Sequence, residues 1–212
     1  MHVLYIAAVL SLLSLSAAVP VPCEEKIRPL LLQDFSQISG KWIVIEVAAN
    51  QEYNGIHKAA KSSWIEILPI NKDIAIFNTA NMINGECAYF TMNMTISDNN
   101  IRFIITHNNT VTLLPTCAGC LVMNGITYLE GPIIKTMHIL GRPGKKLNDS
   151  ELETFRNQLE CVGLPPPIFH HDEQQELCLE KKSEESESKP DEDKSDGPER
   201  AASCHLPVVN GQ

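Results

Sequence analysis

Between Lys41 and Arg142, short runs of apolar and β-branched residues alternate with clusters of turn residues, and this repetition constrains the fold more than any other feature of the sequence. The runs suit pleated strands, and the breaks are rich in Asn, Asp, Gly and Pro, as at Asn84-Gly85. Strands at such regular spacing predict an all-β barrel or sandwich. The predicted strands are residues 41–49, 62–68, 74–79, 87–96, 101–107, 110–116, 119–127 and 133–140.

One helix is predicted after the last strand, over about residues 149–161. One of residues 148–150 can cap its first turn, and apolar residues such as Phe155 and Leu159 recur at helical spacing. Three consecutive prolines at 165–167 prevent the helix from continuing.

Both ends of the chain are predicted to lie outside the folded domain. Residues 1–18 have the apolar core and the small-residue end of a secretory signal peptide. Residues 19–178 are expected to form the domain, and residues 179–212 an acidic, disordered tail. A calcium-binding or partner-binding tail is the alternative. Because no later segment is long and apolar enough to span a bilayer, we expect a secreted, extracellular protein without integral membrane association.

The composition fits an extracellular glycoprotein. A net charge of −9 argues against nucleic acid and anionic membrane surfaces as partners. Seven cysteines in a secreted chain imply disulfides with one thiol left over. Cys204 in the tail is the odd cysteine, so an otherwise monomeric protein has one candidate for an intermolecular disulfide. N-glycosylation sequons begin at Asn93, Asn108 and Asn148.

Two clusters of potentially reactive residues have competing interpretations. The segment Cys117-Ala118-Gly119-Cys120 lies at a predicted turn, where it can form a structural disulfide, two free thiols or a thioredoxin-like redox motif. No helix that would lower a thiol pKa is predicted there, which disfavours the redox motif. The segment His170-His171-Asp172-Glu173 offers metal-ligand types, but neighbouring side chains of an extended segment point to opposite sides. We therefore predict no metal site, and no cofactor or catalytic motif is recognised.

The order of motifs along the chain resembles the lipocalin family. Gly40-Lys41-Trp42 opens the first strand, Gly141-Arg142 ends the last, and a helix that ends near Leu159-Glu160-Cys161 follows. Within the family the sequence is most similar to alpha-1-acid glycoprotein and to the fish proteins that bind saxitoxin, tetrodotoxin or tributyltin. The resemblance implies an eight-stranded, up-and-down antiparallel barrel with one C-terminal flanking helix. One conserved block of the family, at the seventh strand, does not match: residues 116–120 stand in its place.

The resemblance also assigns structural roles. Gly40, Trp42 and Arg142 would form a plug at one end of the barrel, in which the guanidinium lies on the indole face. Two disulfides are implied, Cys23–Cys161 and Cys87–Cys178.

The barrel interior is the predicted ligand site. A glycosylated Asn93 must face outward, so strand alternation turns Phe90, Met92 and Met94 inward and Cys87 outward. The comparison with the family turns residues of other strands inward, and places Tyr53 and Glu52 over the mouth and His107 near the opposite rim. The ligand-binding candidates are Tyr53, Ser63, Ile65, Ile67, Phe90, Met92, Met94, Phe103, Ile105, Met137 and Ile139. They include no Lys or Arg, which favours apolar or weakly cationic ligands over fatty acids. The alternative is that these residues fill a solid core.

The resemblance implies a secreted carrier of a small hydrophobic or amphiphilic molecule, such as a lipophilic xenobiotic, a toxin or a steroid-like ligand, rather than an enzyme. One alternative is a lipocalin-type isomerase, which uses a cysteine inside the barrel. Another is an immunomodulatory acute-phase glycoprotein that acts through its surface. Cys87 is predicted to be outward and disulfide-bonded, which disfavours the isomerase.

Overall fold

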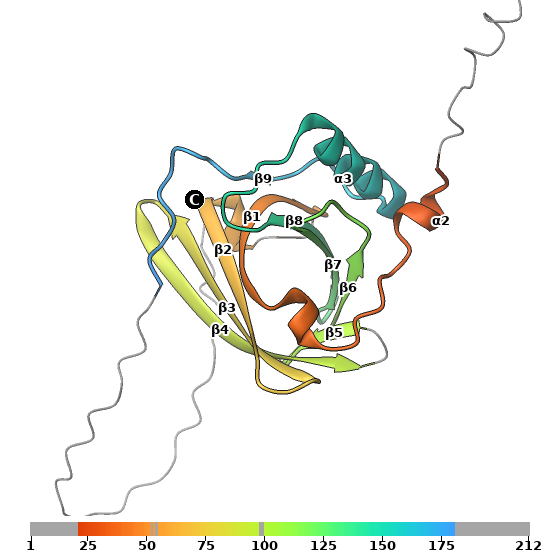
Figure 1. Ribbon diagram of the computed structural model, residues 1–212, viewed down its shortest axis with the longest axis horizontal. Coiled ribbons are helices and arrows are strands. Elements are labelled where there is room, and N and C mark those ends of the chain that lie inside the picture. The colour runs from red at the N-terminus through yellow and green to blue at the C-terminus, as the bar shows by residue number, and fades with distance from the viewer. Residues whose placement is uncertain (1–20, 52, 54, 98–99, 181–212) are drawn as a thin grey trace, which may run out of the picture. The chain divides into compact units, whose positions relative to one another are not determined.

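Eight antiparallel strands follow one another around a closed barrel (Figure 1). Each strand pairs with the next in sequence, and the first strand closes the ring by pairing with both the second and the eighth. The predicted up-and-down barrel is therefore confirmed. The strands are β1 Gly40–Ala49, β2 Ala60–Pro69, β3 Ile74–Ile83, β4 Glu86–Ser97, β5 Asn100–Phe103, β6 Asn108–Leu114, β7 Cys120–Tyr128 and β8 Ile133–Gly141.

The computed structural model describes residues 21–51, 53, 55–97 and 100–180. The predicted signal peptide, Glu52, Cys204 and the tail beyond residue 180 lie outside the described residues.

The β3–β4 hairpin shows how local sequence sets strand length. Asn84 and Gly85 both have positive φ values, 53° and 85°, and Ile83 pairs directly with Glu86 across them. Two residues with positive φ form the tight turn that matches the twist of antiparallel strands, and Asn-Gly is its preferred sequence. Strand β3 consequently runs up to this turn instead of ending at residue 79 as predicted.

Strand β5 is shorter than predicted, because it ends at Phe103 rather than at residue 107. The buried Asn109 holds the following loop: its side-chain oxygen accepts from the Phe103 N–H, and its amide nitrogen donates to the carbonyl oxygens of Phe103 and His107. These side-chain bonds replace the ladder that a longer strand would make. The register confirms the short contact, since β5 meets β6 only at Ile101 and Val111.

Helix α3, Asp149–Val162, lies against the outside of the barrel beside β7 and β8 (Figure 1). Its N-terminus is a capping box, in which Asn148 accepts from the Glu151 N–H and the Glu151 carboxylate accepts from the Asn148 N–H. Phe155 and Leu159 are buried in the cluster that joins the helix to the barrel wall. Burying two such side chains contributes about 1.5–3 kcal/mol each to stability.

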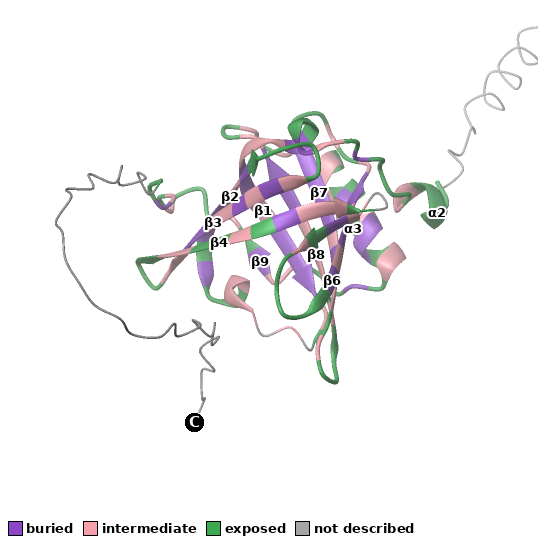
Figure 2. Cartoon of the chain, turned by 90° about the horizontal axis from the view of Figure 1, so that it is seen from below, coloured by how far each residue is buried: buried purple, intermediate pink, exposed green. Residues whose placement is uncertain are grey.

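Short elements complete the domain. Helix α2 is Cys23–Lys26, and the 3-10 helices η1 and η2 are Phe35–Ile38 and Ile56–Lys58. The unpredicted strand β9, Phe169–His170, pairs with β1 at Glu46 and Val47, beyond the point where β2 stops pairing with β1. Figure 2 shows that the barrel strands carry most of the buried residues, whereas the connecting loops are mainly exposed.

Two long-range disulfides fasten the flanking segments to the barrel. Cys23 and Cys161 join α2 to the end of α3, and Cys87 and Cys178 join β4 to the C-terminal segment. Both pairs are those that the lipocalin resemblance implies. Closing loops of this length contributes about 4–5 kcal/mol each on the chain-entropy model.

Candidate ligand-binding site

The closed end of the barrel is plugged by Trp42 and Arg142. The guanidinium carbon of Arg142 lies 3.7 Å from the centre of the Trp42 ring, and its nitrogen donates to the carbonyl oxygens of Ser39 and Lys41. Gly40 has a φ of +87°, and a Cβ there would lie 3.2 Å from the same Arg142 nitrogen. Glycine is therefore required both by backbone conformation and by the close approach of the guanidinium.

Inward-facing side chains divide the barrel into two halves. Towards the plug, Ile67, Ala75 and Met94 have no exposed surface, and the segment before β1 adds Phe35 and Ile38 to the same cluster. Phe103, which pairs with Met94, is only partly buried against that cluster. Along β4 away from the plug, Met92 is also partly buried and Phe90 is 43% exposed. Half of the barrel is thus a packed core, and the other half presents apolar side chains that retain accessible surface.

Most of the predicted inward orientations agree with the structure. Ile65, Ile67 and Met94 belong to the interior cluster, and Met92 and Phe103 pack against it. Ser63 is buried and donates to the side-chain oxygen of the buried Asn81 directly across the β2–β3 ladder. On β4, Cys87 and Tyr89 lie on the outer face, as predicted, against the segment that ends at Leu179. The role of the inward residues as ligand contacts stays a prediction.

Three predicted inward residues are placed differently. Met137 and Ile139 pack with Phe155 and Leu159 under α3, so their predicted inward orientation is wrong. Strand β8 has apolar residues on both faces because the helix covers its outer side, and apolar alternation then fails to distinguish the faces. Ile105 lies in the loop after β5 and is 44% exposed, so its predicted place on an inward strand is also wrong.

The opposite register of β8 brings His138 into the barrel. His138 pairs with Val47, and its ring meets that of His57 with centroids 5.2 Å apart. The His57 ring also contacts Phe169 of β9, at 5.7 Å. Burial lowers the pKa of His57 to about 4, and burial together with repulsion from His57 lowers that of His138 to about 3. Both imidazoles are therefore neutral at physiological pH.

These two histidines are surrounded by protein and nevertheless keep part of their surface accessible. The Nδ1 atom of His57 is buried and has no hydrogen-bond partner among the described residues. A neutral imidazole pair with an unused nitrogen can exchange a hydrogen bond with a bound molecule.

Tyr53 lies on the loop over this end, as the resemblance implies. A Cβ on Gly55 would lie 2.1 Å from the Tyr53 ring and hydroxyl oxygen, so the ring packs directly on the glycine backbone. Burial raises the Tyr53 pKa to about 12, against a smaller opposite effect of the hydrogen bond from the His57 N–H. The loop residue thus touches the same segment that carries His57. On the opposite rim, His107 is exposed.

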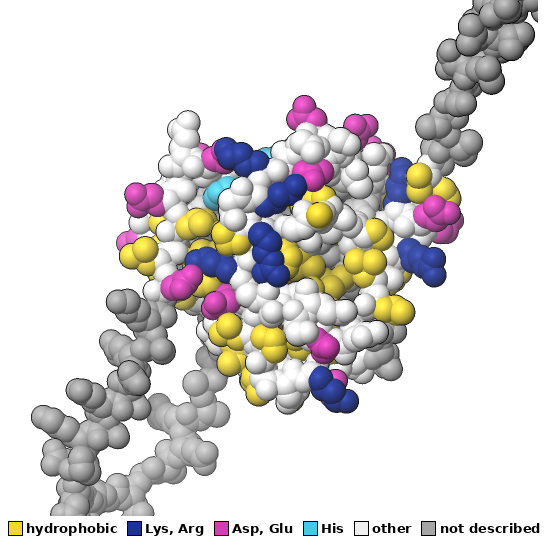
Figure 3. Space-filling model, viewed as in Figure 1, with side chains coloured by type: hydrophobic (Ala, Val, Ile, Leu, Met, Phe, Trp, Pro, Cys, Tyr) yellow, Lys and Arg dark blue, Asp and Glu magenta, His cyan; other side chains and the backbone are white. Residues whose placement is uncertain are grey.

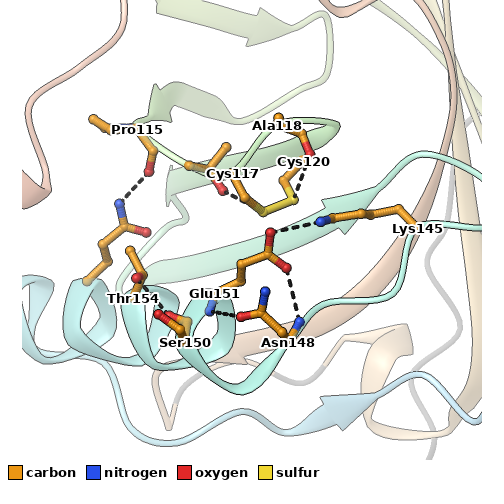
Figure 4. The surroundings of a disulfide bond; sticks show 11 residues. Pro115, Cys117, Ala118, Cys120, Lys145, Asn148, Ser150, Glu151 and Thr154 are labelled. Carbon is orange, nitrogen blue, oxygen red and sulfur yellow. Dashed lines mark hydrogen bonds and ion pairs between the residues drawn. A yellow bond between two sulfur atoms is a disulfide. The ribbon is translucent and has the colours of Figure 1, made fainter.

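The Cys117–Cys120 pair forms a disulfide beside the N-terminus of α3 (Figure 4). Gly119 has a φ of +72°, which the turn between the two cysteines requires. Glu151 lies within 4.8 Å of both sulfurs, but its oxygens accept from the Lys145 ammonium and the Asn148 N–H. Of the three interpretations, the disulfide is the one present, and it closes a turn rather than lining the barrel.

The His170-His171 segment does not form a metal cluster. His170 Nδ1 lies 3.0 Å from a Glu46 oxygen across the β1–β9 ladder. Among the described residues, the only three potential ligand side chains close enough to share an ion are Cys117, Cys120 and Glu151. The three sequon asparagines, Asn93, Asn108 and Asn148, are exposed, and their glycosylation stays a prediction.

Sequence reasoning missed His57, His138, Phe169 and Glu46 as site residues. Glu46 interrupts the apolar run of β1, which is a detectable signal for a buried polar group, whereas β8 also contains Lys135 and Thr136 and gives no such signal for His138. Phe169 follows a run of prolines and has no such signal, because its position depends on the C-terminal segment returning to β1. Among the described helices, none has the length and apolar character needed to cross a membrane.

Comparison with curated proteins finds significant sequence similarity to two proteins of the pufferfish Takifugu pardalis. The chain is 27% identical over 196 residues to saxitoxin and tetrodotoxin-binding protein 2, and 25% identical to saxitoxin and tetrodotoxin-binding protein 1. Each match covers 82% of this chain and 48% of the relative, so the chain spans about half the length of these relatives. No family model matches the sequence. The predicted similarity to the fish toxin-binding proteins is confirmed, whereas that to alpha-1-acid glycoprotein stays a prediction.

Comparison with solved structures finds the same barrel. The siderocalin Ex-FABP superposes with a TM-score of 0.55 at 14% identity, covering 64% of this chain and 95% of that structure. The bovine lipocalin allergen Bos d 2 gives a TM-score of 0.52 at 19% identity, covering 62% and 89%. The strand order, the Trp42–Arg142 plug and the similarity to these solved structures show that the chain has the lipocalin fold.

Proposed function

We propose that the protein is a secreted carrier that binds a small hydrophobic or amphiphilic molecule in the open half of its barrel. The observation that carries this proposal is the change in burial along the barrel axis. Met94 is fully buried, whereas Phe90, four residues earlier on the same inward face of β4, is 43% exposed. A solid core has no reason to leave an inward phenylalanine accessible, but an open calyx does.

The chemistry of the open half favours a ligand with an apolar body and few polar groups. Phe90, Met92 and Phe103 offer apolar contact, and the neutral His57 and His138 offer hydrogen bonds without charge. None of these residues is a cation that could pair with a buried carboxylate, so a fatty acid would lose hydration without compensation. Apolar toxins, lipophilic amines and steroid-like molecules fit this description better, and the similarity to proteins named for saxitoxin and tetrodotoxin binding supports a toxin or xenobiotic.

The disulfides support secretion and disfavour the isomerase. All six cysteines in the described part of the chain are paired in three disulfides, which persist in oxidising compartments. The described barrel consequently supplies no free thiol for a cysteine mechanism. Nothing among the described residues favours the surface-acting glycoprotein beyond the three exposed sequons.

Displacement of a neutral fluorescent probe, N-phenyl-1-naphthylamine, tests the proposal. Met92→Arg places a charge inside the open half, and we expect it to abolish probe binding while far-ultraviolet circular dichroism stays unchanged. Thr91→Arg is the matched control, because the neighbouring Thr91 is exposed on the outer face of the same strand. Equal probe binding by both variants, or unfolding caused by Met92→Arg, would contradict an open, ligand-binding barrel.

A further inference from the structure

A cavity lies outside the barrel wall, and none of its lining residues belongs to the proposed ligand site. Its volume is about 530 Å³, and three parts of the chain enclose it: the outer face of β1, the segment from Pro143 into α3, and the C-terminal segment after β9. Apolar walls come from Ile43 and Ile45 of β1 and from Leu152 and Leu177 of the other two parts. In Figure 3, histidine, charged and hydrophobic side chains lie close together near the region where Figure 1 labels β9.

Glu46 brings a buried carboxylate to this cavity. Only 4% of the residue is exposed, although it carries a formal charge. One oxygen, Oε1, lies 3.0 Å from His170 Nδ1 and 3.6 Å from an Arg156 nitrogen. The other, Oε2, is buried and has no hydrogen-bond partner among the described residues. Buried carboxylate oxygens are nearly always hydrogen-bonded, so Oε2 is an acceptor left unsatisfied at the wall of the cavity.

His171 supplies a second unused polar atom among the residues that line the cavity. Its backbone N–H donates to the Ile45 carbonyl oxygen at 2.8 Å, which fixes the residue against β1. Its Nδ1 is buried without a hydrogen-bond partner in the described chain. The nearby basic side chains are already engaged, since Lys145 pairs with Glu151 and Lys146 with Glu173.

We propose that this cavity, which we call the outer site, binds a small amphiphile whose head group donates hydrogen bonds, such as a lipophilic amine. The donor reaches Glu46 Oε2, and the apolar body packs against Ile43, Ile45 and Leu177. A carboxylate head of the same length is rejected, because it offers no donor and is repelled by Glu46, while both lysines are paired with glutamates. The outer site does not depend on whether the barrel binds a ligand.

Histidine-selective ¹⁵N labelling of the full-length protein distinguishes the two sites in one experiment. His170 and His171 report on the outer site, whereas His57 and His138 report on the barrel. Titration with n-octylamine should shift the His170 and His171 resonances saturably, and octanoate at the same concentrations should not. Glu46→Gln removes the charge without changing the shape, and should weaken octylamine binding about tenfold or more. Glu66→Gln, on β2 and away from the cavity, is the matched control.

The outcomes separate the outer site from the carrier proposal. If octylamine shifts only His57 and His138, the outer site is refuted and the barrel site stands. If octanoate binds as well as octylamine, or if Glu46→Gln binds octylamine as tightly as the wild type, recognition by Glu46 is refuted. Should Glu46→Gln change the circular dichroism spectrum, Leu152→Trp provides the second test, because it fills the cavity from α3 and must block the His170 and His171 shifts.

Discussion

The two neutral histidines in the open half of the barrel predict a loss of stability as the pH falls. The pKa of His57 is lowered from 6.5 to about 4, and that of His138 from 6.5 to about 3, mainly by burial. The unfolded chain therefore binds these two protons at a higher pH than the folded chain. Because the unfolded state holds more protons in this window, the free energy of unfolding is highest above about pH 6.5 and decreases towards pH 4.

The magnitude follows from the same values. At about pH 5 an unfolded histidine is almost fully protonated, while the folded His57 and His138 remain largely neutral. The difference lowers the free energy of unfolding by at most about 2 kcal/mol for each histidine relative to pH 7.5. Both rings keep partial access to solvent, which reduces the burial effect below this maximum.

Urea unfolding of the wild type and of His138→Phe at about pH 7.5 and about pH 5 measures this effect. Phenylalanine keeps an aromatic ring beside His57, so the variant should fold, and its pH-dependent loss should be smaller than that of the wild type by up to about 2 kcal/mol. His107→Phe, at the exposed rim, should lose as much as the wild type. Glu151 and Glu173 have lowered pKa values, and with His171 they contribute equally to every variant. Identical losses in wild type and His138→Phe would refute the assignment of His138 to the interior.

Three further predictions concern the frame of the barrel. Arg142→Met should lower the free energy of unfolding by about 2 kcal/mol, because it removes the contact with the Trp42 indole and two hydrogen bonds. An unchanged melting temperature at neutral pH would contradict a stabilising role of the plug. Replacing Cys117 and Cys120 by Ser should cost about 2 kcal/mol, against about 5 kcal/mol for Cys23 and Cys161, because the closed loop is far shorter. The replacement of Cys117 and Cys120 should leave the binding of N-phenyl-1-naphthylamine unchanged. A chain that ends at Glu180 should keep the wild-type melting temperature, because the hydrogen bonds of Ser62, Trp64 and Tyr89 with residues 176–179 remain. A decrease of several degrees would mean that the tail packs on the barrel.

The barrel was predictable because its information is local. Eight apolar runs with turn residues between them fix the number and order of antiparallel strands, and Asn84-Gly85 specifies a tight hairpin. The ends of the strands were less predictable, since they depend on single side-chain contacts. Asn109, for instance, terminates β5 through three hydrogen bonds that no pattern of apolar residues reveals.

The face of each strand was predictable only where one side is exposed. On β4 the outward Asn93 set the register correctly, and Met92 and Met94 face inward as expected. On β8 the helix α3 covers the outer face, so Met137 and Ile139 are buried outside the barrel while His138 lies inside. The disulfide partners of Cys23 and Cys87 needed the family resemblance, because spacing alone leaves every connectivity open.

The residues that strand patterns misplace or overlook are the ones on which both proposed sites depend. His138 lies inside the barrel although strand alternation predicts it on the outer face, and Glu46 interrupts the apolar first strand with a carboxylate that is 4% exposed. Each violates the local rule that buries hydrophobic residues and exposes charged ones, and each leaves a cost that packing alone does not offset. At His57, the contact partner of His138, and at Glu46, one buried polar atom has no partner within the described chain. A molecule bound at either proposed site would offset part of this cost if it exchanged a hydrogen bond with the unpartnered atom.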